Sequence, residues 1–252
     1  MRFLLLGPVT AYRRGEPVVL GRRAQRLVLG LLLLSAGRPV PVERLEALLW
    51  EGDPPDGARA LVQTHVSRLR RVLDPARDGA TGFRLVARGS TYTAEVAPET
   101  VDAHRFRVDV ERAAELADPE RRACALRAAL ALWQGPLLSD VADDALRDRV
   151  GAGLAELRLS AWESCAEADL AAGRHRRAAA ELADLVAEEP TRETLVVLLM
   201  TALCLGGRGS AALALFERTR RVLAAELGAD PGPELRGLHR SILRGERVPL
   251  LR

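Results

Sequence analysis

The segment from residue 60 to residue 73, ALVQTHVSRLRRVL, predicts one helix with two chemically different faces. Its apolar side chains recur at the spacing of one helical face, and this stripe must pack against a protein core: Val62, Val66, Leu69 and Leu73. The opposite face carries polar and basic side chains, namely Gln63, Thr64, Ser67, Arg68, Arg70 and Arg71. Arginines bind guanine edges and phosphates, and short polar side chains let a helix approach bases closely. The pattern is typical of a major-groove reader, and a solvated basic face is the ordinary alternative.

The residues before this helix predict strands and two further helices. Short apolar runs at residues 3–6, 9–12 and 18–20 indicate β-strands, and the first is too short for the apolar part of a signal peptide. Helices are predicted at residues 22–35 and 42–50, with Trp50 closing the core. The run Asp53-Pro54-Pro55-Asp56 then breaks the chain and supplies a candidate N-cap region for the third helix.

A β-hairpin is predicted after the third helix. Its strands lie at residues 83–87 and 92–96, and Arg88-Gly89-Ser90-Thr91 separates them. Three helices followed by a hairpin make a winged helix. Arg88 near the hairpin tip can reach a DNA backbone or a minor groove, with an ordinary turn arginine as the alternative. His65, at the edge of the reader helix, either contacts a phosphate or covers the core.

The charge is distributed unevenly along the chain. Residues 1–97 hold 15 arginines and nine acidic residues, a balance of +6, whereas the remainder has 22 arginines and 25 acidic residues, a balance of −3. A basic front part joined to a mildly acidic back part is the pattern expected of a nucleic-acid-binding module attached to another domain.

The composition changes near residues 97–101, where we place a domain boundary. The predicted domains are a winged helix at 1–97 and an all-helical domain at 102–252, with a cap at Asp102. Gly173-Arg174 recurs 34 residues later as Gly207-Arg208, and Ala178 with Ala212 and Leu182 with Phe216 keep the same offset. This period fits tetratricopeptide-type repeats, which bind other proteins or themselves. The fold class is therefore mainly α with small β.

Nothing in the sequence indicates an enzyme, a metal site or a cofactor. Asp143 and Asp144 are adjacent, so they face different directions on a helix, and acids at a helix N-terminus are the ordinary explanation. The other histidines stand on separate helices without a nucleophile at motif spacing: His104, His175 and His239. The cysteines form no CxxC pair and are expected to be buried core thiols: Cys124, Cys165 and Cys204. No apolar run is long enough to span a bilayer, so a membrane protein is not expected, and the cysteine pattern indicates a cytoplasmic protein.

Several motifs, in order along nearly the whole chain, carry a family resemblance. VSRLRRVL with the Arg-Gly-Ser-Thr-Tyr hairpin behind it resembles an OmpR-type winged helix. VERLEALLWEGDPPDGARALVQTHVSRLRRVL, VDAHRF, ALWQGPLLSDV, LRLSAWESCAEADLAAGRH and ELGADPGPELRGLHRSIL are similar to motifs of the Streptomyces antibiotic regulatory protein (SARP) family. In that family a tetratricopeptide-like bacterial transcriptional activation domain follows the winged helix. No P-loop pattern is present, so the chain resembles a small member.

The resemblance implies a transcriptional activator of secondary-metabolite genes. It would bind direct repeats in promoter DNA, associate as a dimer there, recruit RNA polymerase with its sigma factor, and lie in the cytoplasm on the nucleoid. Family motifs assign DNA contacts to Arg68 and Arg70, and to Arg88 in the wing. Ser67 stands where the family has an arginine, which implies another base preference or one fewer phosphate contact. Thr91 stands where glycine usually precedes the wing tyrosine, which implies a hairpin turn that differs from the family's.

Other readings stay open at the level of sequence. The same folds could serve a repressor, or a protein-interaction adaptor whose winged helix binds protein, although the basic balance argues against the adaptor. The helical repeats also form grooves that could hold a small molecule, but no residue pattern marks a pocket.

Overall fold

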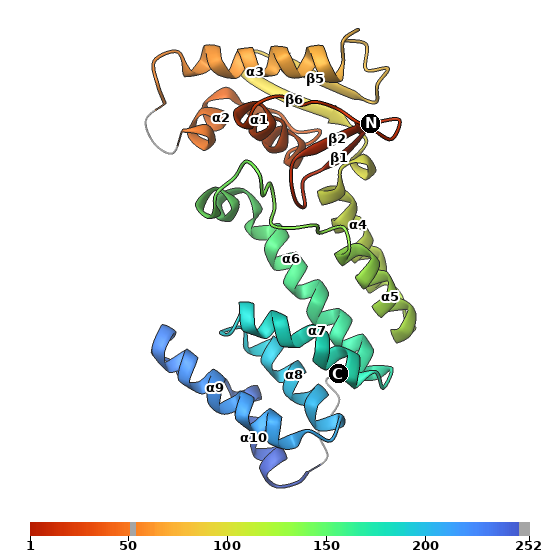
Figure 1. The fold of residues 1–252 in the computed structure, drawn as a ribbon, viewed down its shortest axis with the longest axis vertical. Coiled ribbons are helices and arrows are strands. Elements are labelled where there is room, and N and C mark those ends of the chain that lie inside the picture. Colours follow the sequence, from red (N-terminus) through yellow and green to blue (C-terminus); the bar gives the residue numbers. More distant parts are fainter. Residues whose placement is uncertain (51–53, 247–252) are drawn as a thin grey trace. The chain divides into compact units, whose positions relative to one another are not determined.

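The computed structural model describes residues 1–50 and 54–246, in two compact units. The first unit comprises Met1–Asp109 and Ala129–Leu157, and the second comprises Val110–Ala128 and Arg158–Arg252. Helices dominate and the strands are short (Figure 1), so the predicted fold class is confirmed. The domain boundary expected at residues 97–102 stays a prediction. Each compact unit combines two separate segments of the chain, so the units do not test where one sequence domain ends and the next begins.

Three short antiparallel strands open the first unit, in the order β1 (Arg2–Leu4), β2 (Thr10–Arg13) and β3 (Glu16–Pro17). The first two predicted strands are confirmed with shifted ends. The strand expected at 18–20 is wrong: Val18 donates one backbone hydrogen bond to Ala11 (2.9 Å), but Val19 is 85% exposed. Pro17 has no N–H to donate, which weakens the ladder at the point where the chain leaves the sheet.

The three helices and the hairpin follow as predicted. They are α1 (Arg23–Leu34), α2 (Val42–Leu49), α3 (Ala58–Leu73), β5 (Phe83–Arg88) and β6 (Thr91–Val96). The short strand β4 (Val40–Pro41) completes a sheet of order β4-β6-β5. The apolar stripe of α3 is at most 1% exposed and packs against α1 and α2. Trp50, expected to close the core, is half-buried.

The start of α3 differs from the expected cap. Asp53 lies outside the described residues. The N-cap residue is Gly57, which has no side chain to accept a capping hydrogen bond. Gly57 has φ of 82°, a left-handed conformation that glycine adopts without steric cost. The backbone turn therefore starts this helix, and the structure does not use Asp56 as its N-cap.

Asp102 ties β1 to helix α4 (Asp102–Ala114), which follows a short 3-10 turn at Pro98–Thr100. Its carboxylate is 5% exposed and accepts the backbone N–H groups of Leu5 (2.8 and 2.9 Å) and Leu6 (3.0 Å). It also accepts the N–H of Ala103 at 2.7 Å. Burial raises the pKa of this carboxyl, although the backbone donors oppose that effect. Asp102 thus satisfies two amides that the sheet leaves unpaired.

Residues 134–140 complete the surroundings of the same N-terminal stretch. Three backbone amides of this segment donate to carbonyls of the N-terminal stretch: Gln134 to Leu6 (2.7 Å), Leu138 to Leu5 (2.9 Å) and Ser139 to Gly7 (3.1 Å). Asp140 accepts the amide of Val9 (2.8 Å) and pairs with Arg26 (2.8 Å). These bonds explain why Ala129–Leu157 belongs to the first compact unit.

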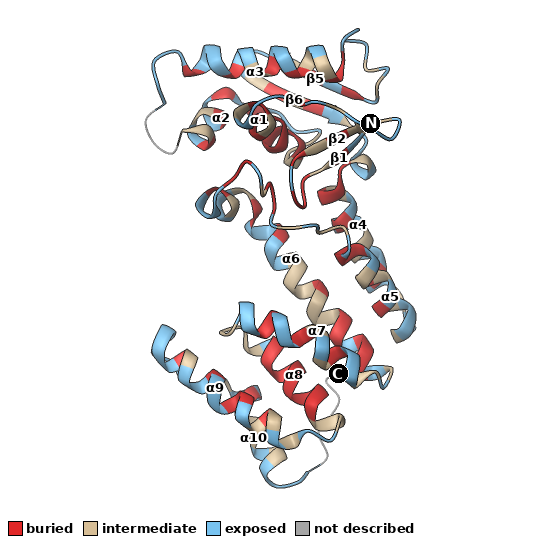
Figure 2. Cartoon of the chain, viewed as in Figure 1, coloured by how far each residue is buried: buried red, intermediate tan, exposed pale blue. Residues whose placement is uncertain are grey.

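The remaining helices are α5 (Pro119–Leu130), α6 (Asp144–Ala171), α7 (His175–Glu188), α8 (Glu193–Leu205), α9 (Gly209–Leu227) and α10 (Pro233–Leu243). In the second unit α8 packs against α7, α9 and α10. It is the most buried of these helices, as its colour in Figure 2 shows, with every residue from Leu195 to Leu203 buried.

The 34-residue repeat is confirmed in three dimensions. Gly173 and Gly207 have φ of 73° and 76°. The backbone amide that follows each glycine donates to a backbone carbonyl of the preceding helix, that of Asp169 (2.7 Å) and that of Leu203 (2.8 Å), respectively. Both helix pairs therefore turn through the same left-handed glycine cap. Ala178 and Ala212 are fully buried, which lets the paired helices approach closely.

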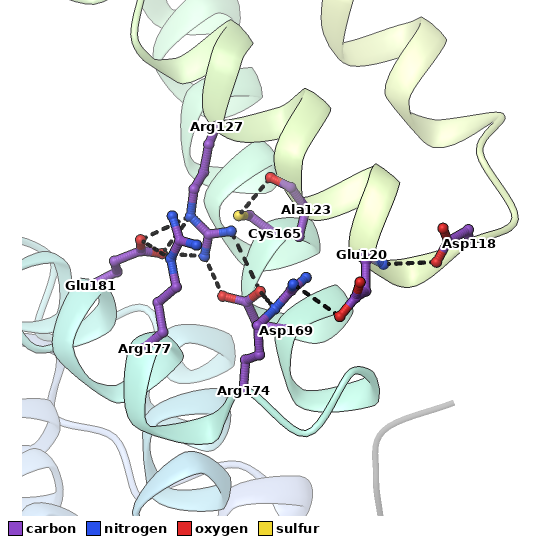
Figure 3. A network of polar contacts seen from close by, with 9 residues as sticks. All are labelled: Asp118, Glu120, Ala123, Arg127, Cys165, Asp169, Arg174, Arg177 and Glu181. Carbon is purple, nitrogen blue, oxygen red and sulfur yellow. Dashed lines mark hydrogen bonds and ion pairs between the residues drawn. The ribbon is translucent and has the colours of Figure 1, made fainter.

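A network of ion pairs joins α5, α6 and α7 within the second unit (Figure 3). Asp169 has no exposed surface and binds both Arg127 and the Nε of Arg174 (3.0 Å). Arg127 also binds Glu181 (2.6 Å), which Arg177 contacts as well (3.1 Å). Burial acts to raise the pKa of Glu181, but the hydrogen bonds from these two arginines hold it below its ordinary value. The network compensates the buried Asp169 charge.

The cysteines differ from one another. Cys165 is buried beside Ala123, and burial raises the pKa of its thiol to about 11, so the thiol stays protonated at neutral pH. Cys204 is half-buried and Cys124 is exposed. The prediction of three buried thiols is therefore right for Cys165 and wrong for Cys124. Cys124 follows the buried Ala123 on α5, and one step along a helix turns a side chain away from its neighbour's face.

Among the described residues, no group of His, Cys, Asp and Glu has a geometry that could hold a metal ion. None of the helices in residues 1–50 and 54–246 combines the length and the apolar character needed to cross a membrane.

Candidate nucleic-acid interface

Helix α3 presents most of the predicted reader residues on its outer face. In Figure 2 exposed and buried residues alternate along this helix. The exposed ones include Gln63, Thr64, Ser67, Arg68 and Arg71. Within the described part of the chain neither Arg68 nor Arg71 has an acidic partner, so both guanidinium groups are free to bind an anion. The helix thus combines a buried stripe with an exposed basic and polar face.

Arg70 lies on a different side of α3 from the one expected. It is half-buried, its Nε donates to the carbonyl oxygen of Leu85 on β5 (2.9 Å), and its guanidinium lies 6.0 Å from the ring centroid of Tyr92 on β6. The expectation that Arg70 faces solvent beside Arg71 is wrong, because the hairpin packs against that side of the helix. A contact between Arg70 and DNA stays a prediction.

Replacing Arg70 with alanine is expected to lower the free energy of unfolding by about 2 kcal/mol, because a charged hydrogen bond and a cation–π contact are lost. Thermal unfolding followed by circular dichroism measures the change. Arg71→Ala is the matched control, since Arg71 is exposed and its loss should cost about 0.5 kcal/mol or less. Equal losses in the two variants would contradict a role for Arg70 in fastening the hairpin.

Two residues of the reader helix are less available for contacts outside the protein than their neighbours. The hydroxyl of Thr64 donates to the carbonyl of Ala60 (2.8 Å), one turn earlier in the same helix. His65 is half-buried, and its Nδ1 has no hydrogen-bond partner among the described residues. Burial lowers the pKa of His65, and the positive charge of Arg68 lowers it further, so both effects favour the neutral ring. Of the two alternatives for His65, these observations favour covering the core.

Arg88 is exposed at the end of β5, where the hairpin turns through Gly89 and Ser90. Gly89 has φ of 56°, which glycine tolerates. Thr91 is accommodated in this turn, because its hydroxyl donates to the carbonyl of Arg88 (2.9 Å) and closes the turn. Arg88 therefore extends from a well-bonded hairpin end.

The fold places two further arginines near the hairpin that the sequence pattern did not single out. Arg77 and Arg84 line a concavity of about 280 Å³ together with Arg70 and the buried Asp74, between the end of α3 and β5. The signal for Arg84 was the strand alternation, since Phe83 and Leu85 on either side are buried. Arg77 lies in the loop after α3, and only the fold brings it to this surface.

Comparison with known proteins assigns both parts of the chain. Residues 15–104 match the family "Transcriptional regulatory protein, C terminal", and residues 101–243 match "Bacterial transcriptional activator domain". The chain is 35% identical to the regulatory protein DnrI of Streptomyces peucetius over 98% of its own length and 93% of DnrI. The chain belongs to the SARP family of transcriptional regulators. Both families and DnrI are transcriptional regulators and not enzymes, which agrees with the expectation from the sequence that the chain carries no catalytic site.

Larger SARP-family relatives share the same two domains. Regulatory protein AfsR of Streptomyces coelicolor is 40% identical over 98% of this chain, which spans 24% of AfsR. The regulator EmbR of Mycobacterium tuberculosis is 39% identical over 96% of this chain, which spans 63% of EmbR. The solved structure of EmbR in complex with a low affinity phosphopeptide superposes with a TM-score of 0.84 at 38% identity, covering 99% of this chain and 66% of that one.

Proposed function

We propose that this SARP-family regulator binds promoter DNA as an activator, with α3 in the major groove and the β5–β6 hairpin beside it. The observation that supports this most is the exposed face of α3, where Arg68 and Arg71 have no acidic partner within the described residues. Thr64 and Ser67 lie one helical turn apart on this face, and we assign sequence preference to them together with Arg68.

Phosphate contacts are assigned to the surrounding arginines. Arg71 and Arg88 are exposed near the reader face, and Arg77 and Arg84 add charge at the concavity beside the hairpin. Because each phosphate contact releases counterions from DNA, affinity should fall steeply as the salt concentration rises.

We further propose that two copies occupy direct repeats about one helical turn apart. The helical unit would contact the second copy, RNA polymerase with its sigma factor, or both, since stacked helical repeats commonly present protein-binding surfaces. Family membership supports secondary-metabolite biosynthetic genes as targets. Action on chromosomal DNA would place the protein in the cytoplasm, on the nucleoid.

Replacing Arg68 with alanine is expected to weaken binding to a promoter fragment by about 1–3 kcal/mol and to relax specificity, because Arg68 would contact a base. The measurement is a gel-shift titration on promoter fragments from the gene neighbourhood and on random DNA, repeated over a salt series. Arg236→Ala on α10 is the matched control, because it removes the same charge from an exposed position outside the winged helix.

Equal losses of Arg68→Ala on promoter and random DNA would show a phosphate contact instead of a base contact. Absence of any shift with the unaltered protein, even at low salt, would contradict the proposed function and favour the protein-interaction adaptor.

A further inference from the structure

A cavity of about 150 Å³ in the first unit gathers four arginines from different parts of the chain. Arg38 follows α1, Arg44 lies on α2, Arg107 on α4 and Arg149 on α6. Ser35 and His104 add polar groups, and the rest of the lining consists of leucine, valine and alanine side chains. The lining therefore combines positively charged and apolar side chains.

No acidic residue is among the residues that line this cavity. Some of the acids on the same helices are paired with arginines outside the lining: Glu43 with Arg59 (3.2 Å), Asp109 with Arg105 (3.2 Å), and Asp144 with Arg147. Within the described residues, none of the four arginines of the cavity has an acidic partner. Like charges gathered in one lining repel each other, and an anion held among them would remove that cost.

The cavity is distinct from the reader face, since no residue of α3 or of the β5–β6 hairpin lines it. Its walls are joined to each other by hydrogen bonds. The Nε2 of His104 on α4 contacts the carbonyl of Leu33 on α1 (2.8 Å), and the Nη2 of Arg149 on α6 donates to the carbonyl of Ala47 on α2 (3.4 Å). The arginines are thus presented by elements that are fixed to one another.

We propose that this cavity binds a phosphoryl group, either as free phosphate or as part of a small phosphorylated metabolite. Arginine presents several N–H donors in a planar fork that matches phosphate oxygens, so the arginines of this lining suit a phosphoryl group. The apolar side chains of the lining would contact the remainder of a metabolite. This site goes beyond DNA binding and does not depend on it.

Isothermal titration of the full chain tests the proposal, with inorganic phosphate and adenosine triphosphate as separate ligands in chloride buffer of constant ionic strength. We expect saturable binding of one ligand per chain. Arg107→Ala and Arg149→Ala should each weaken it about tenfold, the effect of losing one charged hydrogen bond. Arg112→Ala, an exposed position on the same helix as Arg107 and not part of the lining, should bind as the unaltered chain does.

The ligands and variants separate the possible outcomes. Tighter binding of inorganic phosphate supports a free-anion site, and tighter binding of adenosine triphosphate supports a metabolite site. No saturation with either ligand would overturn the proposal, as would equal weakening by Arg112→Ala. Weakening by Arg68→Ala with no effect of Arg107→Ala would place the anion on the reader face and also overturn it. Because Arg107 lies off that face, failure here is distinguishable from failure to bind DNA.

Discussion

Replacing Asp169 with alanine should lower the free energy of unfolding by about 3–5 kcal/mol, the usual cost of breaking a buried ion pair from one side. Asp169 has no exposed surface, and its partner Arg127 is 15% exposed. Without this carboxylate, Arg127 keeps Glu181 and Arg174 keeps the exposed Glu120 (3.2 Å), but both lose their one fully buried partner. The loss comes from leaving positive charge in a poorly solvated place. Thermal unfolding of the full chain, monitored by circular dichroism, measures the change. The substitution lies in the second unit.

Two further variants separate charge from packing at this position. Asp184→Ala removes an exposed carboxylate from α7 and should cost about 0.5 kcal/mol or less. The double variant Arg127→Met with Asp169→Leu removes both buried charges and should be more stable than Asp169→Ala alone, because apolar replacements of a buried pair are often neutral. A double variant as unstable as Asp169→Ala would contradict this account, since it retains neither the buried carboxylate nor the Arg127 charge that is left behind.

Replacing Asp102 with alanine should cost about 3–5 kcal/mol in the first unit, because two buried amides lose their acceptor together. Leu5 and Leu6 are at most 1% exposed, so water cannot replace the carboxylate. Asp102→Asn retains one acceptor oxygen and should lose about half as much. Thermal unfolding compares both variants with Asp109→Ala, which removes an acid further along α4 that pairs with Arg105 near the surface.

An unfolding midpoint for Asp102→Ala close to that of Asp109→Ala would contradict this account. It would mean that the N-terminal strand finds other partners for its amides. Hydrogen exchange of Leu5 and Leu6 gives a local readout, since both amides should exchange faster in Asp102→Ala and stay protected in Asp109→Ala.

Periodicity made much of the fold predictable, because local patterns decide which face of a helix is buried. The stripe on α3 and the 34-residue repeat needed no knowledge of distant partners. Arg70 was misplaced because its side of the helix is covered by a hairpin, and tertiary packing decides that contact. The role of Asp102 was hidden because its partners precede it by 97 and 96 residues. The arginines of the cavity were equally hidden, since they come from four separate segments.

The hydrogen bonds around residues 5–9 limit how this architecture can be recombined. A fragment cut at residue 97 would lose the carboxylate of Asp102 and also the backbone and side-chain partners supplied by residues 134–140. The segment after β1 would then have unsatisfied amides and carbonyls on a surface that the intact chain covers. Exchanging DNA specificity between relatives by grafting therefore requires residues 129–157 to travel with residues 1–109. Although the two family matches meet near residue 101, the compact unit that carries α3 combines two separate segments of this chain.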